Sequence, residues 1–171
     1  MSRIIIVIGV SGSGKTTIGQ YLSNRINIPF HDADAFHPEA NIEKMKAGHP
    51  LDDKDRQPWL EALANAMAGW EQDKGAVLAC SALKEKYRKT LQKGASEKII
   101  WIMLEGDFEL IKERMIKRKN HFFDPKMLES QYKAYERPDY GYFFDVKNSP
   151  QEIIDAIVED LKDNNELGCL K

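Results

Sequence analysis

The sequence predicts an α/β protein with a buried parallel sheet and helices on both of its faces. Apolar runs alternate with segments of helical periodicity, and no internal repeat, low-complexity tract or Gly/Ser linker interrupts the alternation. A chain of 171 residues with 42% hydrophobic content can bury one sizeable core but not several. We therefore expect a single domain over residues 1–171.

Five segments predict strands, because they have the density of Ile, Val, Phe or Trp that suits strands covered on both faces. In chain order they are residues 3–8, 29–32, 76–80, 98–104 and 142–146. Helices are expected between them. One spans residues 59–70, where apolar residues recur at steps of three and four and form one stripe that should pack on the sheet.

Two further helices have start signals. Asp107 is a candidate N-cap for a helix that buries Phe108 and places Arg114 and Arg118 one turn apart, on a face away from its apolar residues. Ser149 begins a capping box with proline at the first helical position, followed by apolar residues up to Leu161. The pattern stops there, so a frayed tail is expected over residues 163–171.

The charge balance excludes some partners. With 25 Lys+Arg against 27 Asp+Glu, the chain has a formal net charge of -2, which argues against a protein that coats nucleic acid. Two cysteines cannot make a disulfide framework, and the apolar run near Met1 is too short for a membrane span or a signal segment. We expect a cytoplasmic protein with no membrane or nucleic-acid partner.

Residues 9–16 match the pattern G-x-x-x-x-G-K-[ST] of a phosphate-binding loop, between a buried strand and a helix. Glycines allow successive N–H groups to turn inward, where they and the positive end of the following helix hold a polyphosphate. Lys15 should reach the β- and γ-phosphates, and the Thr16 hydroxyl should bind Mg²⁺. The alternative is a glycine-rich turn without a ligand. The candidate nucleotide-binding residues here are Gly9, Ser11, Gly12, Ser13, Gly14, Lys15, Thr16 and Thr17.

Several features narrow the class of nucleotide-binding protein. No N-K-x-D guanine-reading segment is present, and the third expected strand ends at Cys80-Ser81 without the usual Walker-B aspartate. The length leaves little room for the extra subdomains of motors. Transfer of a phosphoryl group to a small molecule is therefore the leading interpretation.

Asp32 and Asp34 lie two residues apart at the carboxyl end of the second expected strand, where α/β sheets bind ligands. We assign Asp32 to the metal and Asp34 to the substrate hydroxyl, which it would orient and whose proton it would accept. The alternative is that the two residues form an Asx turn or a helix N-cap that ends the strand.

A series of polar motifs then makes the chain identifiable. Together with the phosphate loop, they resemble gluconate kinase over nearly the whole chain up to the tail. One departure is Tyr135, where family members more often carry Leu, in a slot that we take as apolar. The motifs are residues 32–38, Asn41, 44–45, 48–53, 55–60, 80–84, 87–88, 121–123 and 130–131.

The resemblance implies a P-loop kinase fold, with five parallel strands in the order 2-3-1-4-5 and a mobile lid at about residues 118–137. It implies the ATP-dependent phosphorylation of D-gluconate at its 6-hydroxyl, giving 6-phospho-D-gluconate and ADP by direct in-line transfer. It also implies a homodimer.

A linear sugar acid needs a cation for its carboxylate and polar groups for its hydroxyls. Arg56 is the candidate for the carboxylate, fixed at a helix start by the turn at Pro58-Trp59. The alternative is that Arg56 pairs with Asp52, Asp53 or Asp55 in a solvated cluster. The other candidate substrate-binding residues are His37, Lys44, Ser81, Lys84 and Arg88, besides Asp34.

The basic stretch from Arg114 to Lys119 is the expected lid. Arg114 and Arg118 would bind the nucleotide, neutralising the transferring phosphoryl group and sandwiching the adenine. A helix with a solvated basic face is the alternative. The predicted catalytic residues are thus Lys15, Asp34 and Arg118. Rival functions are a shikimate-kinase-like or nucleoside monophosphate kinase, and a nucleotide-binding regulatory module without turnover.

Overall fold

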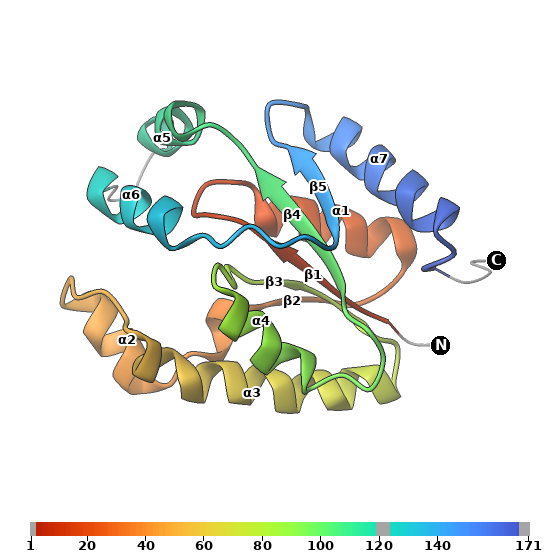
Figure 1. The fold of residues 1–171 in the computed structure, drawn as a ribbon, viewed down its shortest axis with the longest axis horizontal. Coiled ribbons are helices and arrows are strands. Elements are labelled where there is room, and N and C mark those ends of the chain that lie inside the picture. The colour runs from red at the N-terminus through yellow and green to blue at the C-terminus, as the bar shows by residue number, and fades with distance from the viewer. Residues whose placement is uncertain (1–2, 119–123, 168–171) are drawn as a thin grey trace.

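The computed structural model describes residues 3–118 and 124–167 and contains one five-stranded sheet (Figure 1). All neighbouring strands are parallel, in the order β2-β3-β1-β4-β5. The predicted fold class and strand order are confirmed, with strand ends within two residues of expectation. The strands are β1 Ile4–Ile8, β2 Phe30–Asp32, β3 Ala76–Ala79, β4 Ile100–Glu105 and β5 Tyr142–Asp145.

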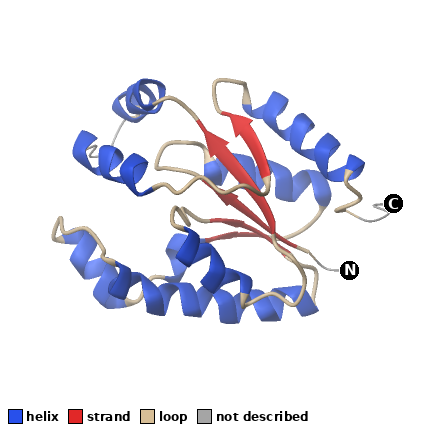
Figure 2. Cartoon of the chain, in the orientation of Figure 1, coloured by secondary structure: helices blue, strands red, loops and turns tan. Residues whose placement is uncertain are grey.

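Helices cover both faces of the sheet (Figure 2). On one face α1 and α7 pack against each other and against the sheet, and on the other α3 and α4 do so. A short 3-10 helix, η1 Ala33–Phe36, directly follows β2. The α-helices are α1 Lys15–Ile26, α2 Glu39–Lys46, α3 Asp53–Gln72, α4 Glu85–Gln92, α5 Phe108–Lys117, α6 Pro125–Ala134 and α7 Pro150–Asp163.

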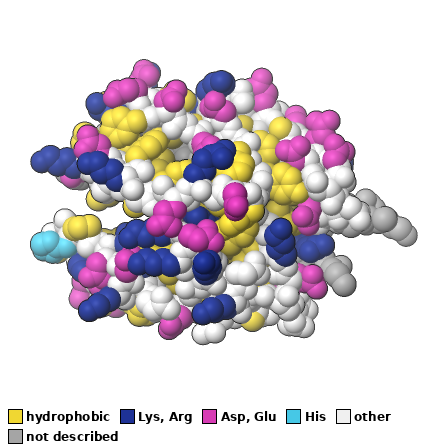
Figure 3. Space-filling model, viewed as in Figure 1, with side chains coloured by type: hydrophobic (Ala, Val, Ile, Leu, Met, Phe, Trp, Pro, Cys, Tyr) yellow, Lys and Arg dark blue, Asp and Glu magenta, His cyan; other side chains and the backbone are white. Residues whose placement is uncertain are grey.

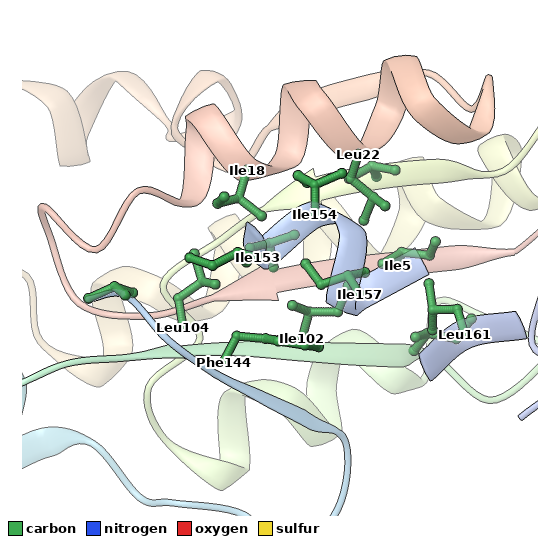
Figure 4. Packing of buried hydrophobic residues seen from close by; sticks show 14 of the residues in the cluster. Ile5, Ile18, Leu22, Ile102, Leu104, Phe144, Ile153, Ile154, Ile157 and Leu161 are labelled. Atoms are coloured by element: carbon green, nitrogen blue, oxygen red, sulfur yellow. The ribbon is translucent and has the colours of Figure 1, made fainter. Parts of the chain in front are cut away.

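The core has two apolar layers, because side chains alternate across β1. Ile5 and Val7 face the layer that α1 and α7 close, while Ile4, Ile6 and Ile8 face the layer under α3 and α4. Figure 4 shows the first layer, in which side chains of α7 fill the space between α1 and the strands. The strands are thus held rigidly, and their carboxyl ends form the edge on which the site is built.

Helix α3 begins six residues before the predicted start at Trp59. Asp52 and Asp55 form a capping box, each side chain accepting the other residue's backbone N–H at 2.8 Å. Pro58 lies inside the helix on its exposed side, where the carbonyl that loses its N–H partner can be hydrated. The predicted turn at Pro58-Trp59 and helix start at Trp59 are therefore wrong, because the upstream capping box outweighs the proline signal.

Helix α7 begins as predicted, with a capping box between Ser149 and Glu152. Residues 164–167, within the expected frayed tail, turn back onto the helix. The Glu166 N–H donates to the Leu161 carbonyl at 2.9 Å, and Leu167 packs against the core. Residues 168–171 lie outside the described part of the chain. Among the described residues, no helix is long and apolar enough to cross a membrane.

Candidate active site

The loop between β1 and α1 has the backbone shape that phosphate binding requires. Gly12 and Gly14 have φ angles of 78° and 96°, which residues with a side chain rarely adopt. Gly14 is also the N-cap of α1, and neither a side-chain cap nor an acidic residue occupies the first turn. The unpaired N–H groups of that turn, with the positive end of the helix dipole, thus face the loop. The buried Ser13 hydroxyl oxygen adds a polar atom without a hydrogen-bond partner in the described structure.

Lys15 lies at the centre of the charged groups at this edge. Its Nζ donates to the Val10 carbonyl at 3.0 Å. Burial lowers the pKa of Lys15, the nearby carboxylates of Asp34 and Asp32 oppose that shift, and the charge of Arg118 adds to it. The charges of Asp34 and Asp32 after β2 and of Arg118 at the end of α5 therefore influence the Lys15 amine, and these residues include the other two predicted catalytic residues.

Asp32 and Asp34 take different positions. The Asp32 side chain caps η1, accepting the Asp34 N–H at 3.0 Å, as the N-cap alternative predicts. The Asp34 side chain is 87% exposed, and its carboxylate lies 3.9 Å from His37 Nε2. Capping by Asp32 fixes the turn that carries Asp34 and leaves its carboxylate exposed.

Trp59 of α3 supports this turn through a hydrogen bond. The indole N–H of Trp59 donates to the Ala33 carbonyl at 2.7 Å. The His37 ring stacks on Trp59 with ring centroids 4.4 Å apart and an angle of 14° between the planes. Burial lowers the pKa of His37, so the ring is neutral near pH 7 and its polar atoms can exchange hydrogen bonds with hydroxyls.

The expected substrate side contains a cluster of lysines held by two aspartates of α3. Asp53 accepts hydrogen bonds from Lys84 at 3.1 Å, from Lys86 and from Tyr87. These donors, Lys86 first, hold the pKa of Asp53 far below its usual value. Asp55, besides capping α3, accepts from Lys44 at 2.5 Å, which raises the pKa of Lys44.

Arg56 lies beside this cluster. It donates to the Leu51 carbonyl, and its guanidinium carbon lies 5.7 Å from the centre of the Tyr87 ring. Within the described ion pairs, Asp53 and Asp55 pair with lysines instead. Figure 3 shows Lys and Arg side chains along the α2–α4 side of an indentation in the surface, facing α5 and α6.

Arg88 does not have the predicted substrate-binding geometry. Its side chain is 1% exposed, and all of its guanidinium nitrogens donate to protein atoms: the carbonyls of Ala82, Leu83 and Glu136, the Glu85 carboxylate and the Tyr140 hydroxyl. Since no donor is left for a ligand, we assign Arg88 a structural role. The loop residue Ser81 remains half-exposed at the end of β3.

Tyr135 and Cys80 are two further residues of the quoted sequence whose surroundings the structure shows. Tyr135, predicted to fill an apolar slot, donates its hydroxyl to the Glu105 carboxylate at 2.8 Å. Cys80 is buried, and burial raises the pKa of its thiol to about 12, so it stays protonated. Cys80 is therefore a small core residue and not a nucleophile.

The described part of the lid region borders the phosphate loop. Arg114 donates to the Val146 carbonyl at 2.6 Å, and Arg118 ends α5 as its exposed C-cap. The Gln131 side chain of α6 forms two hydrogen bonds with Ser11. Lys119 and the expected motif at residues 121–123 lie outside the described residues.

The residues available for Mg²⁺ are Thr16, exposed in the first turn of α1, and Asp32. No described group of three or more His, Cys, Asp or Glu side chains could hold a metal by protein ligands alone. Mg²⁺ usually takes one or two protein oxygens, with phosphates and water completing its shell. A hydroxyl and a carboxylate beside a phosphate loop therefore fit this ion.

Sequence reasoning missed the roles of Asp53 and Gln131. The sequence places Asp53 in one of the polar motifs and offers it only as an alternative partner of Arg56. Its actual partners, Lys84 and Lys86, lie more than 30 residues later, at the start of α4. Gln131 was noted without a role, and its partner lies 120 positions away. A polar residue on an amphipathic helix gives no local signal of such a partner.

Comparisons with known proteins agree with this geometry. A family model described as shikimate kinase matches residues 11–162. The chain is 42% identical over 172 residues to a probable gluconokinase of Dictyostelium discoideum, covering 93% of this chain and 86% of that protein. It is 41% identical over 137 residues to the thermoresistant gluconokinase of Escherichia coli K12, covering 80% and 78%. The crystal structure of a gluconokinase from Sinorhizobium meliloti 1021 matches with a TM-score of 0.83 at 34% identity, covering 95% and 97%.

Proposed function

The chain belongs to the gluconokinases, within the family of the shikimate kinase model, and we propose that it transfers the γ-phosphoryl group of ATP to the 6-hydroxyl of D-gluconate. The products are 6-phospho-D-gluconate and ADP. The observation that supports this best is the phosphate-binding shape of the β1–α1 loop at one edge of the sheet, where the charges of Asp34 and Arg118 act on the Lys15 amine. Such an edge provides a phosphate cradle, a carboxylate for a hydroxyl and a cation for the transferred group.

In this mechanism the protein supplies positioning and electrostatic stabilisation. The N–H groups of the loop and the first turn of α1 bind the phosphates. Lys15 leaves the Val10 carbonyl to contact the β- and γ-phosphates, and its amine stabilises charge as transfer proceeds. Asp34 accepts a hydrogen bond from the 6-hydroxyl, orients its oxygen toward the γ-phosphorus and takes its proton.

We propose Thr16 and Asp32 as the Mg²⁺ ligands. Bound Mg²⁺ would neutralise phosphate charge. With or without Mg²⁺, the Asp32 side chain caps η1 and so holds the turn that carries Asp34.

Gluconate would lie along the side of the site formed by α2, α3 and α4. Arg56 carries a cation suited to a carboxylate, and the neutral His37 and the charged Lys44 and Lys84 can contact hydroxyls. Asp53 and Asp55 fix the two lysines before the substrate arrives. Preorganised charges of this kind select a polyhydroxy acid over a neutral sugar.

Arg118 would neutralise the transferring phosphoryl group, and Arg114, held at the Val146 carbonyl, would border the adenine. We propose that residues 118–137 act as a lid over both ligands. Its closure would exclude water that otherwise hydrolyses ATP.

A coupled ADP-release assay with ATP and Mg²⁺ tests the proposed function. Gluconate, shikimate and AMP are offered in turn as acceptors. We expect ADP release above background with gluconate alone, and phosphorus NMR of the product should show a phosphate ester at C6. Turnover only with shikimate or AMP would contradict the proposal, and tight ATP binding without any turnover would indicate a regulatory module.

A homodimer in the cytoplasm completes the proposal, and it rests on family resemblance alone. Sedimentation equilibrium should give twice the mass of 19.6 kDa. Cell fractionation should place the activity in the cytosol. A monomer at micromolar concentration would contradict the first statement.

A further inference from the structure

The Gln131 side chain forms a two-point contact with the phosphate loop. Its Oε1 accepts the Ser11 backbone N–H at 2.7 Å, and its Nε2 donates to the Ser11 hydroxyl oxygen at 2.9 Å. Both groups of one amide are thereby used on one residue, 120 positions away in sequence. A paired arrangement of this kind fixes orientation as well as distance, which a single hydrogen bond does not.

Within the loop, the Ser13 N–H and the Lys15 amine both donate to the Val10 carbonyl, and the Gln131 contact adds a link to another element. The loop's glycine at position 12 has a positive φ and Gly14 caps α1 without a side-chain bond. Ser13, the next side chain along the loop, has a buried hydroxyl with no partner among the described residues. Ser11 is therefore the loop residue tied to another element through its own N–H and hydroxyl.

The supporting helix is itself well anchored. Leu128 of α6 is buried in the core, and the Tyr132 hydroxyl donates to the Gly106 carbonyl at 2.7 Å. After α6, the Glu136 N–H donates to the Leu83 carbonyl at 2.9 Å. Gln131 thus projects from a docked segment, so the position of α6 determines where the Ser11 N–H points.

From this geometry we propose that Gln131 is a positioning residue that acts through Ser11 to hold the phosphate loop in the shape that binds a triphosphate. The inference rests on the proposed use of ATP. Gln131 acts on the phosphate end of the nucleotide and leaves the adenosine end unaffected. It also makes ATP affinity depend on the docking of α6.

Binding of nucleotides to the Gln131→Ala variant tests the proposal without any need for gluconate turnover. By isothermal titration calorimetry, we expect ATP affinity to fall about tenfold, equal to about 1.4 kcal/mol, because two hydrogen bonds that organise the loop are lost. The affinity for AMP, which lacks the outer phosphates, should stay within twofold. In the ADP-release assay, KM for ATP should rise by a similar factor while KM for gluconate stays constant.

Three further variants sharpen the test. Lys133→Ala, at an exposed position of the same helix, is the matched control and should bind ATP like the parent chain. Ser11→Ala removes the hydroxyl partner, and combining it with Gln131→Ala should cost less than the product of the two single effects, since both act on one contact. Gln131→Glu keeps an acceptor for the Ser11 N–H but brings a negative charge to the loop, so it should weaken ATP more than AMP.

Defined outcomes would overturn the proposal. An ATP affinity that is unchanged or raised in Gln131→Ala would show that the contact does not prepare the loop. Equal losses for ATP and AMP, or independent effects of the Ser11 and Gln131 variants, would show that Gln131 acts elsewhere. If gluconate is not phosphorylated but the ATP and AMP affinities separate as stated, the proposed function fails and the role of Gln131 stands. The thermal midpoint of each variant checks that folding is retained.

Discussion

The two sides of the site are built in different ways. The phosphate side is made from backbone, in one continuous stretch whose N–H groups are aimed by two glycines with positive φ. The proposed substrate side is made from charged side chains that come from α2, α3 and α4 and are held by Asp53 and Asp55. A phosphate is recognised by any chain that can form such a loop, whereas a polyhydroxy acid needs charges placed by the whole fold.

This comparison predicts that the chemistry fails most severely where the two sides meet, at Asp34. Asp34→Asn keeps the size of the side chain and removes the base, so kcat should fall about 10³-fold. ATP affinity should stay within a few-fold, because the loop is untouched. The ADP-release assay and calorimetry measure the two effects. A kcat within tenfold of the parent value would mean that Asp34 does not act on the hydroxyl.

The next largest effect is a loss of stability when Arg88 is replaced, which tests whether Arg88 has a structural role or binds the substrate. Arg88→Met leaves the Glu85 carboxylate and three carbonyls without their buried donor. We expect a loss of about 3 kcal/mol in the free energy of unfolding, measured by urea denaturation. Lys89→Met, exposed on the same helix, is the control and should change stability little. Normal stability with a raised KM for gluconate would restore the predicted substrate contact.

The phosphate side can be tested with two glycines of similar backbone conformation, one inside the phosphate loop and one outside it. Gly14 and Gly48 both have positive φ, and a Cβ at either would meet nothing within 4 Å. Gly14→Ala and Gly48→Ala should each destabilise the fold by about 1 kcal/mol. ATP affinity should fall about tenfold in Gly14→Ala alone, since disturbed N–H groups there bind phosphate. Similar ATP affinities in the two variants would contradict a backbone-built phosphate site.

The smallest effect is the acid sensitivity of the substrate side. The Lys86, Tyr87 and Lys84 hydrogen bonds lower the pKa of Asp53 in the folded chain from its ordinary value of 3.8. Asp53 therefore contributes stability above pH 3.8, and this contribution is lost as the pH falls toward the folded pKa. The Asp53→Asn variant should show a shallower decline of the urea midpoint below that pH than the parent chain. Parallel curves for the two proteins would mean that the Asp53 contacts do not stabilise the fold.

Sequence patterns within a few residues correctly predicted the elements whose structure depends on neighbouring residues. The loop from Gly9 to Thr16, the capping box at Ser149 and the apolar runs of the strands each carry their signal within a few residues. The start of α3 was missed because the capping box at Asp52 and the proline at Pro58 give opposing local signals. Their balance depends on solvent exposure, which the sequence does not show.

The substrate side was predicted less completely, for a physical reason. An arginine or lysine in a polar motif has the same sequence surroundings whether its side chain faces a ligand or the protein interior. The sequence therefore predicts that Arg88 binds the substrate. In the structure its guanidinium donates hydrogen bonds to Glu136 and Tyr140, which lie some 50 residues later. Only the folded arrangement tells the two cases apart.

The anchoring of Glu136 limits how the segment before it can move. Its N–H is held by the Leu83 carbonyl, its carbonyl by Arg88, and its carboxylate by the first turn of α4. Any rotation of α6 must therefore turn about a fixed point just before Glu136. Gln131 lies five residues before Glu136, three of them up to the end of α6 at Ala134 and two of them extended, so the lever is on the order of 10 Å. A tilt of a few degrees moves it by less than an ångström, so releasing Ser11 would demand a large swing or a break in the helix.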